Sequence, residues 1–289
     1  SGGTISIPHG SSSALIDVAV IDDALFENNE TVLATISAPS DPAVGLGTPT
    51  ASGAIFDNDN GAGTITAALS VDAHGSETGP ASIVYRVTMS VVNHTHQAIS
   101  FDITPSGGTA SPADDYADIS GATISVPDGE TTGTLTVAVF DDALFENTET
   151  AEATISSPSD TAVVIATATA SANISDNDNG AATVAASLSA SVQGEEAGPV
   201  ALVYEVTLSK VNETHGPISF TIDPAGGTAA LGSDYVDFTA GTISVPHGAS
   251  SGTMNVTVID DVLFENTETL DAVISAPTDP AVYIDGADA

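Results

Sequence analysis

Positive charge is almost missing from this chain of 289 residues. Arg86 and Lys210 are its only Lys or Arg, against 39 Asp and Glu, and the formal net charge is -37. Proteins hold phosphate backbones and anionic lipid surfaces with Lys and Arg, so the shortage excludes nucleic acid as a partner and opposes binding to a membrane surface. Self-repulsion of this size also disfavours a compact fold. It therefore predicts bound metal ions or a salty environment.

Cysteine and tryptophan are absent, and aromatic residues make up only 4% of the chain. Without Cys there are no disulfides and no thiolate metal sites, so any cross-link between loops must use oxygen ligands. The lack of Trp argues against the sugar-stacking surface of a glycan-binding module. No apolar run approaches the ~20 residues of a membrane helix, so we expect no membrane insertion. Hydrophobic residues still make up 42% of the chain, which is enough to fill cores.

A nearly identical acidic segment occurs three times, at residues 22–30, 141–149 and 260–268, and consecutive copies start 119 residues apart. A segment rich in Ser, Gly and Thr recurs with the same spacing, at 1–8, 120–127 and 240–246, as does Asp-Asn-Asp-Asn at 57–60 and 176–179. A cluster copied in every unit suits a structural metal better than a single active site. The chain is therefore interpreted as a tandem array.

The junctions Asn60-Gly61 and Asn179-Gly180 divide the chain into three parts. Residues 1–60 are expected to be the C-terminal half of a repeat, 61–179 a complete repeat, and 180–289 a repeat that lacks its last strand. We interpret the chain as a window from a longer array. The alternative is that the incomplete ends of neighbouring chains complete each other.

Within 61–179 the hydrophobic period is two, as in half-buried strands. Ile83, Tyr85, Val87 and Met89 alternate with polar residues. Seven strands are predicted in the complete repeat, near 64–71, 83–89, 99–103, 122–126, 135–139, 151–155 and 170–174, and no segment has the pattern of a long amphipathic helix. About seven short antiparallel strands in ~100 to 120 residues are typical of an immunoglobulin-like β-sandwich. The predicted fold is therefore all-β, as tandem immunoglobulin-like β-sandwich repeats of 119 residues.

Acidic residues gather where these strands end. Asp141 and Asp142 follow a predicted strand, and the next turn brings Glu146 back toward them. The same pole of the sandwich is expected to hold the remaining acids of the complete unit, Asp176, Asp178, Asp115 and Glu77, of which Asp115 and Glu77 have counterparts in the third unit at Asp234 and Glu196. Ca²⁺ takes six to eight oxygen ligands in loose geometry, whereas Mg²⁺ needs a stricter octahedron and zinc prefers His and Cys. The predicted ion is Ca²⁺.

Several of these segments together resemble a known family. They are Gly227-Thr228-Ala229, Gly232-Ser233-Asp234-Tyr235, 241–245, the Asp-Asp-x-x-x-Glu turn at 260–265, and Ile174-Ser175-Asp176-Asn177-Asp178. They look like the Calx-beta repeat of sodium/calcium exchangers, integrin β4 and large bacterial surface proteins, over the whole chain. In calcium-binding members, the resemblance implies ligands at Glu77, Asp115, Asp141, Asp142, Glu146, Asp176 and Asp178. The matching positions elsewhere are Glu196, Asp234, Asp260, Asp261 and Glu265 in the third unit, and Asp22, Asp23, Glu27, Asp57 and Asp59 in the first.

One departure from the family pattern and several plainer interpretations stand beside this one. Asn58 and Asn177 occupy the middle of a terminal triplet that is often three acids, which removes a charge from each site. Asp favours turns, so the acidic segments could be turns and solvated linkers, although five separated segments that are acidic at one pole argue against that. Phe26, Phe145 and Phe264 are expected to be core plugs beneath the loop and not ligand-stacking residues.

Two loop motifs are interpreted without a binding role. Asn93-His94-Thr95 and Asn212-Glu213-Thr214 fit the glycosylation sequon, which chance explains in a chain rich in Asn, Ser and Thr. His94 and His96 are expected to be exposed loop residues, because the third unit has only His215 in that loop.

The favoured function is a non-catalytic extracellular array, such as an adhesin stalk or filament, whose junctions are stiffened by Ca²⁺. Its partners are neighbouring repeats of the same chain, lateral association into fibres remains open, and no small-molecule substrate is expected. The alternatives are a calcium-sensing regulatory domain of a membrane transporter and a glycan-binding module of a secreted protein. Enzymatic activity is not expected, because glycosidase-like carboxylate pairs need one cleft and these acids recur in every unit.

Overall fold

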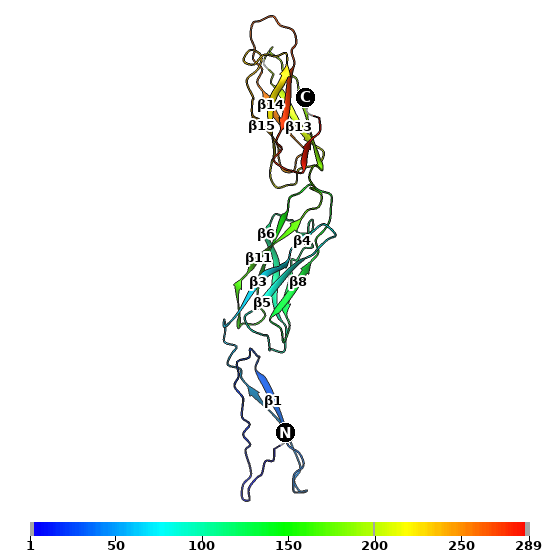
Figure 1. Ribbon diagram of the computed structural model, residues 1–289. Coiled ribbons are helices and arrows are strands. Elements are labelled where there is room, and N and C mark those ends of the chain that lie inside the picture. The colour runs from blue at the N-terminus through cyan, green and yellow to red at the C-terminus, as the bar shows by residue number, and fades with distance from the viewer. Residues whose placement is uncertain (1–2, 199, 287–289) are drawn as a thin grey trace.

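The computed structural model describes residues 3–198 and 200–286, which form an elongated molecule of successive β-units (Figure 1). These residues contain 18 strands and no helix. Accordingly, no membrane-spanning helix is found in the part of the chain that the structure describes. The predicted all-β class and the tandem sandwich architecture are confirmed.

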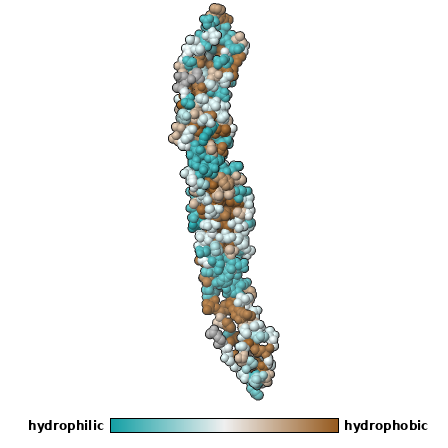
Figure 2. Space-filling model, turned by 90° about the vertical axis from the view of Figure 1, so that its right-hand side faces the viewer, coloured by the Kyte–Doolittle hydropathy of each residue, from teal (hydrophilic) through white to brown (hydrophobic). Residues whose placement is uncertain are grey.

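The first unit is half a sandwich. Its strands β1 (Glu30–Thr35) and β2 (Thr50–Ile55) form a two-stranded antiparallel sheet, with Glu30 opposite Ile55. Among residues 3–60 only Phe26 is buried, and large apolar side chains such as Leu15 and Ile21 face solvent. Figure 2 shows hydrophobic surface on the lower end of the molecule, which is formed by this unit.

The middle unit is a two-layered sandwich. One sheet has the order β10-β3-β5-β8 and the other β4-β11-β9-β6-β7. The strands are β3 (Ile65–Ala73), β4 (Gly75–Ser76), β5 (Ile83–Met89), β6 (Ile99–Gly108), β7 (Ala122–Val126), β8 (Thr132–Val137), β9 (Glu149–Ser156), β10 (Val163–Thr167) and β11 (Thr169–Ser175). The predicted alternation holds in β5, where Ile83, Tyr85, Val87 and Met89 are buried between the sheets.

The middle unit differs from the predicted seven strands in three places. The edge strand β10 was not predicted, and it lies parallel to β3. The short strand β4 was also not predicted, and it lies parallel to β11. Strand β8 begins and ends earlier than expected, and Val139 instead forms an isolated bridge with Tyr116. A two-residue period does not reveal strands as short or as weakly patterned as β4 and β10.

The third unit repeats this plan with fewer strands. Its sheets have the orders β16-β13-β12-β18 and β15-β14-β17. The strands are β12 (Val184–Val192), β13 (Leu202–Leu208), β14 (Ile218–Gly227), β15 (Gly241–Val245), β16 (Ser251–Val256), β17 (Leu270–Ser275) and β18 (Val282–Ile284). Within the described residues, β17 has no neighbour equivalent to β11, so one edge of the second sheet is open.

Consecutive units are joined by a phenylalanine that enters the core of the unit after its own. Phe26 is 3% exposed and belongs to the core of the middle unit, while Phe145 is 1% exposed and belongs to the core of the third unit. The prediction that these two rings plug a core is therefore confirmed, but the core is that of the next unit and not the one beneath the loop. Phe264, the third copy, is 101% exposed, so the prediction that it plugs a core is wrong. Strand periodicity places a side chain on a face but does not say which unit covers it.

Each inserted Phe is seated on a loop of the unit that receives it. The amide N–H of Glu213 donates to the Phe145 carbonyl at 3.1 Å, and that of His94 donates to the Phe26 carbonyl at 3.0 Å. Nearby, the side chain of Asn147 donates to the Thr214 carbonyl at 3.3 Å. The same type of contact therefore occurs at both junctions.

The receiving loops contain the two glycosylation-like sequons, and the structure gives them a packing role. Asn93 and Asn212 are both 0% exposed. The Asn212 amide donates to the carbonyls of Gly216 and Val245, and its oxygen accepts from Thr214. Attachment of a glycan to a side chain enclosed in this way is incompatible with the folded unit. Asn-x-Thr is here a repeated structural motif, which corrects the interpretation that it occurs by chance.

The burial of Phe145 predicts that Phe145→Ala destabilises the third unit by about 3 to 5 kcal/mol, the usual cost of removing a buried Phe side chain. Phe264→Ala is the matched control, because this side chain is fully exposed and its loss should change stability by less than about 0.5 kcal/mol. Chemical denaturation monitored by circular dichroism measures both. Equal effects of the two substitutions would show that Phe145 does not contribute to the junction.

Candidate metal centre

Carboxylate oxygens converge in three groups among the described residues. Within each group the oxygens lie within 4.8 Å of one another. The groups are Glu77, Asp141 and Asp178, then Asp115, Asp142 and Glu146, and in the third unit Glu196, Asp234 and Glu265. All nine of these residues are among the predicted ligands.

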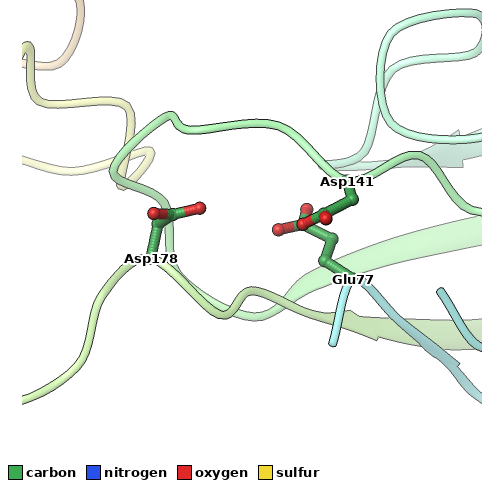
Figure 3. A group of neighbouring side chains, drawn as sticks. All are labelled: Glu77, Asp141 and Asp178. Carbon is green, nitrogen blue, oxygen red and sulfur yellow. The ribbon is translucent and has the colours of Figure 1, made fainter. Parts of the chain in front are cut away.

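The first group draws on three separate loops of the middle unit, and its carboxylates point toward one another (Figure 3). Glu77 follows β4, and its amide N–H donates to the Ser175 carbonyl at 3.0 Å, which holds it beside the end of β11. Gly75 permits this approach, because a Cβ there would lie 2.6 Å from the Val139 side chain. The absence of a side chain at Gly75 thus lets the first loop reach the others.

Asp141 and Asp178 approach Glu77 from the other two loops. The side-chain amide of Asn177 donates to the Asp141 carboxylate at 2.8 Å. Asn177, the middle residue of the Asp-Asn-Asp segment, therefore links the two loops. The Asp178 amide N–H donates to Asp176 at 2.8 Å, which closes a turn directly after β11. The Asn within the Asp-x-Asp segment is therefore a connector between loops.

Two members of the second group, Asp142 and Glu146, lie on the turn that carries Phe145. Asp115 precedes Tyr116, and the Asp115 carbonyl accepts from the Phe140 N–H at 2.8 Å, which attaches this loop to the start of the turn. Asp142 accepts from the Leu144 N–H at 2.7 Å, a turn closed by its own side chain. The Glu146 carbonyl accepts from the Asn179 amide at 2.7 Å. The turn is thereby tied to the linker that leads to the next unit.

The two groups of the middle unit form one electrostatic cluster. Burial raises the pKa of Glu77 to about 8, and the next contributors are Asp176, Asp142 and Glu146. Burial likewise raises the pKa of Glu146 to about 7, with Asp115, Asp142 and Asp176 adding to it. Asp176, which is in neither group, thus lies close to both. The structure therefore brings together the seven acids predicted for this unit.

Glu149 belongs to the same cluster and was not predicted to do so. It is 3% exposed, and burial together with Asp115 and Glu146 raises its pKa to about 8. The signal was present in the sequence, because Glu149 closes the repeated acidic segment and recurs as Glu30 and Glu268. It lies beyond the Asp-Asp-x-x-x-Glu turn from which the ligands were predicted, at the start of β9.

The third unit holds a smaller version of the cluster. Glu196, Asp234 and Glu265 line a hollow of about 760 Å³, which also contains Glu268. Burial and the charge of Asp234 are the main causes that raise the pKa of Glu265, and Asp261 adds to them. Asp261 therefore lies near the group. Asp260 is in none of the three groups and does not line this hollow.

The predicted ligands of the first unit also share one place. Asp22, Asp23, Glu27, Asp57 and Asp59 all line a hollow of about 350 Å³. None of them belongs to the three converging groups of the described residues. Residues 1–60 correspond to residues 120–179 of the middle unit. The loops that carry Glu77 and Asp115 come before this part of the repeat.

The donor set fits a hard divalent cation. Its members are carboxylates, with no His among the three groups, and Ca²⁺ prefers oxygen ligands from several flexible loops. Buried carboxylate oxygens without a hydrogen-bond partner occur at Asp57, Glu77, Glu149, Asp176 and Asp234. A buried oxygen with no partner is costly, and so is the proximity of like charges. One bound cation would offset both costs.

A comparison with protein families agrees with the motifs and the fold. The Calx-beta domain model matches residues 3–60, 72–178 and 189–285. The chain belongs to the Calx-beta family. A comparison of this Calx-beta chain with curated proteins found no match.

Solved structures of Calx domains are similar to this Calx-beta chain at low identity. A crystal structure of CBD12 from CALX1.2 has 19% identity and a TM-score of 0.33, covering 73% of this chain and 80% of that chain. A crystal structure of the calcium binding domain CBD12 of CALX1.1 has 18% identity and a TM-score of 0.33, covering 72% and 80%. The apo-form Calx CBD1 domain has 23% identity and a TM-score of 0.32, covering 39% and 98%. Likenesses of this size carry no functional argument.

The buried carboxyl groups predict that the metal-free protein loses stability as pH rises. The pKa values of Glu77 and Glu149 are raised from 4.5 to about 8, and that of Glu146 to about 7. Between the unfolded and folded pKa values the folded state binds more protons, so the free energy of unfolding falls with increasing pH. We expect a higher melting temperature at pH 5 than at pH 8, measured by calorimetry after removal of metal on a chelating resin.

Glu149→Gln provides the control for this pH dependence, because the amide imitates the protonated acid. It should raise the metal-free melting temperature at pH 8 and change it little at pH 5. A metal-free wild type that is equally stable at both pH values would contradict the assignment of raised pKa values to this cluster.

Proposed function

We propose that this chain is a non-catalytic structural array in which Ca²⁺ binds at the junctions between units and stiffens them. The observation that carries the proposal is the acidic turn of residues 141–146. Asp141, Asp142 and Glu146 of this turn face the carboxylate cluster, whereas Phe145 is buried in the core of the next unit. An ion that fixes the turn would therefore also fix the orientation of Phe145 and of the unit into which it inserts.

The charge of the chain supports the same function. The clusters concentrate part of the net charge of -37 at the ends of units, and hydrophilic bands separate successive units on the surface (Figure 2). Divalent ions at these places would neutralise charge where it opposes the contact between units. Metal binding and order at the junction would then be coupled.

We further propose an extracellular location, in a medium rich in salt and calcium, as the stalk of an adhesin or as part of a filament. Near-identical units suit a spacer, because copying a unit adds length without a new function. The partners of each unit are the neighbouring repeats of its own chain. The deficit of Lys and Arg opposes binding of nucleic acids, and lateral association of chains would need bridging cations.

Calcium should raise both the stability and the stiffness of the chain. At about 100 times the dissociation constant, a ligand that binds only the folded state stabilises it by about 2.7 kcal/mol, which should raise the melting temperature by several degrees. Small-angle X-ray scattering should show a more extended and less variable particle with Ca²⁺ than in EGTA. The same melting curve and scattering profile in both solutions would reject the proposed function.

Asp141→Asn with Asp142→Asn should remove the part of the calcium effect that comes from the cluster of the middle unit. Asp102→Asn with Glu205→Gln is the matched control, because it also removes two charges but acts on acids outside the three converging groups. If the control pair weakened the calcium response as much as the Asp141 and Asp142 pair, the response would come from general charge screening and not from the junction.

A further inference from the structure

The only lysine of the chain lies at the junction between the middle and third units. Lys210 follows β13 of the third unit and reaches back to the middle unit, where its Nζ donates to the Ala143 carbonyl at 3.3 Å. The same Nζ lies 3.6 Å from an Asp178 carboxylate oxygen, with the two side chains 32% and 27% exposed. One ammonium group therefore contacts both the acidic turn and the Asp-x-Asp segment.

The lysine is not required for packing at this position. The equivalent residue 119 positions earlier is Val91, which packs against the core of the middle unit at the first junction. A branched apolar side chain thus fits the same place in the fold. What Lys210 adds is a positive charge and the reach to bring it to Asp178.

The charge is placed where a bound cation would also act. Asp178 shares its group with Glu77 and Asp141, whose carboxylate oxygens lie within 4.8 Å of one another. The ammonium attracts these oxygens in the absence of an ion, and it repels a divalent cation that enters among them. Both effects favour the ion-free junction over the calcium-bound one.

One carboxylate of the third unit acts in the opposite direction to Lys210. Glu213, on the same loop, contributes to the raised pKa of Glu146 and so adds negative charge near the second group. Its carboxylate is also 3.5 Å from the ring nitrogen of His247.

In the described part of the chain, two basic side chains of the third unit reach the acidic cluster of the middle unit. The ring of His215 lies 3.4 Å from a Glu149 carboxylate oxygen, and Lys210 is the one that pairs with a member of the three converging groups.

We propose that Lys210 is a tethered counter-ion that lowers the calcium affinity of the second junction and stabilises that junction when calcium is absent. This inference rests on the proposed function, because it concerns regulation of the same metal site. Lys210 is not a metal ligand in this arrangement. It raises the calcium concentration at which this junction stiffens. A junction with an apolar residue at this position, such as Val91 at the first junction, would bind calcium without this reduction in affinity.

The test measures calcium binding to the full chain by isothermal titration calorimetry. Lys210→Met keeps the length of the side chain and removes its charge, and Lys210→Val copies the residue of the first junction. Both should tighten calcium binding at the junction about tenfold, a partly screened charge effect. Lys210→Arg keeps the charge and should stay within about twofold of the wild type. Wild-type affinity in Lys210→Met, or tightening in Lys210→Arg, would overturn the proposal.

A second measurement separates the charge effect from a packing effect. In metal-free buffer Lys210→Met should lower the melting temperature, whereas in excess calcium it should leave it unchanged or raise it. A loss of packing would lower it in both. Adding Asp178→Asn, which removes the carboxylate paired with Lys210, should remove most of the difference in calcium affinity between Lys and Met, as a double-mutant cycle requires for coupled groups. A difference that persists would place the effect elsewhere.

Failure of this inference is distinguishable from failure of the proposed function. A wild-type chain that binds no calcium at millimolar concentration would reject the calcium-dependent function, and the role of Lys210 with it. A wild type that binds calcium with an affinity independent of residue 210 would reject only the role of Lys210.

Discussion

Mutual repulsion among carboxylates at the ends of the units is the constraint on which the rest of this structure depends. The fold brings four loops of the middle unit to one pole, and each loop carries acids of the cluster. Glu77 and Glu149 are almost enclosed by protein, and both have a carboxylate oxygen without a partner. The sandwich core fixes these groups in place, so the repulsion must be relieved by protons or by a cation. The junction is consequently the part of the molecule most sensitive to its ionic surroundings.

The acidic turn of residues 141–146 connects this electrostatic problem to the packing of the next unit. Glu146 and Phe145 are neighbours in sequence but belong to different environments, one a cluster of oxygens and the other an apolar core. A rotation of the turn would move both side chains together, because the two residues are adjacent in the backbone. The turn thereby couples the charge state of one unit to the orientation of the following unit. Lys210 extends this coupling in the opposite direction, from the third unit back to the turn.

Much of the fold could be predicted because a two-residue hydrophobic period directly reports a half-buried strand, as in β5. The acidic pole could be predicted because strand ends in a sandwich meet at common poles, and the repeated motif showed which acids keep a fixed position. The destination of Phe145 could not be predicted in this way, since a local pattern does not distinguish the core below a loop from the core of the following unit. The same limit applies to Glu149 and to Lys210, whose significance comes from contacts between distant segments. Short strands such as β4 are defined by their pairing and not by their own sequence.

The insertion of Phe145 into the following unit gives the chain a direction. The contact is heterologous, because one unit contributes the aromatic side chain and the next contributes the pocket that receives it. Interfaces of this kind propagate in an open line, whereas self-complementary ones close after two members. The repeated pattern at Phe26 and Phe145 therefore specifies a directional row of units whose two ends differ. One end presents an aromatic side chain, and the other presents the pocket that would receive one. A tether built on this principle can be anchored at one end and present a chemically different surface at the other.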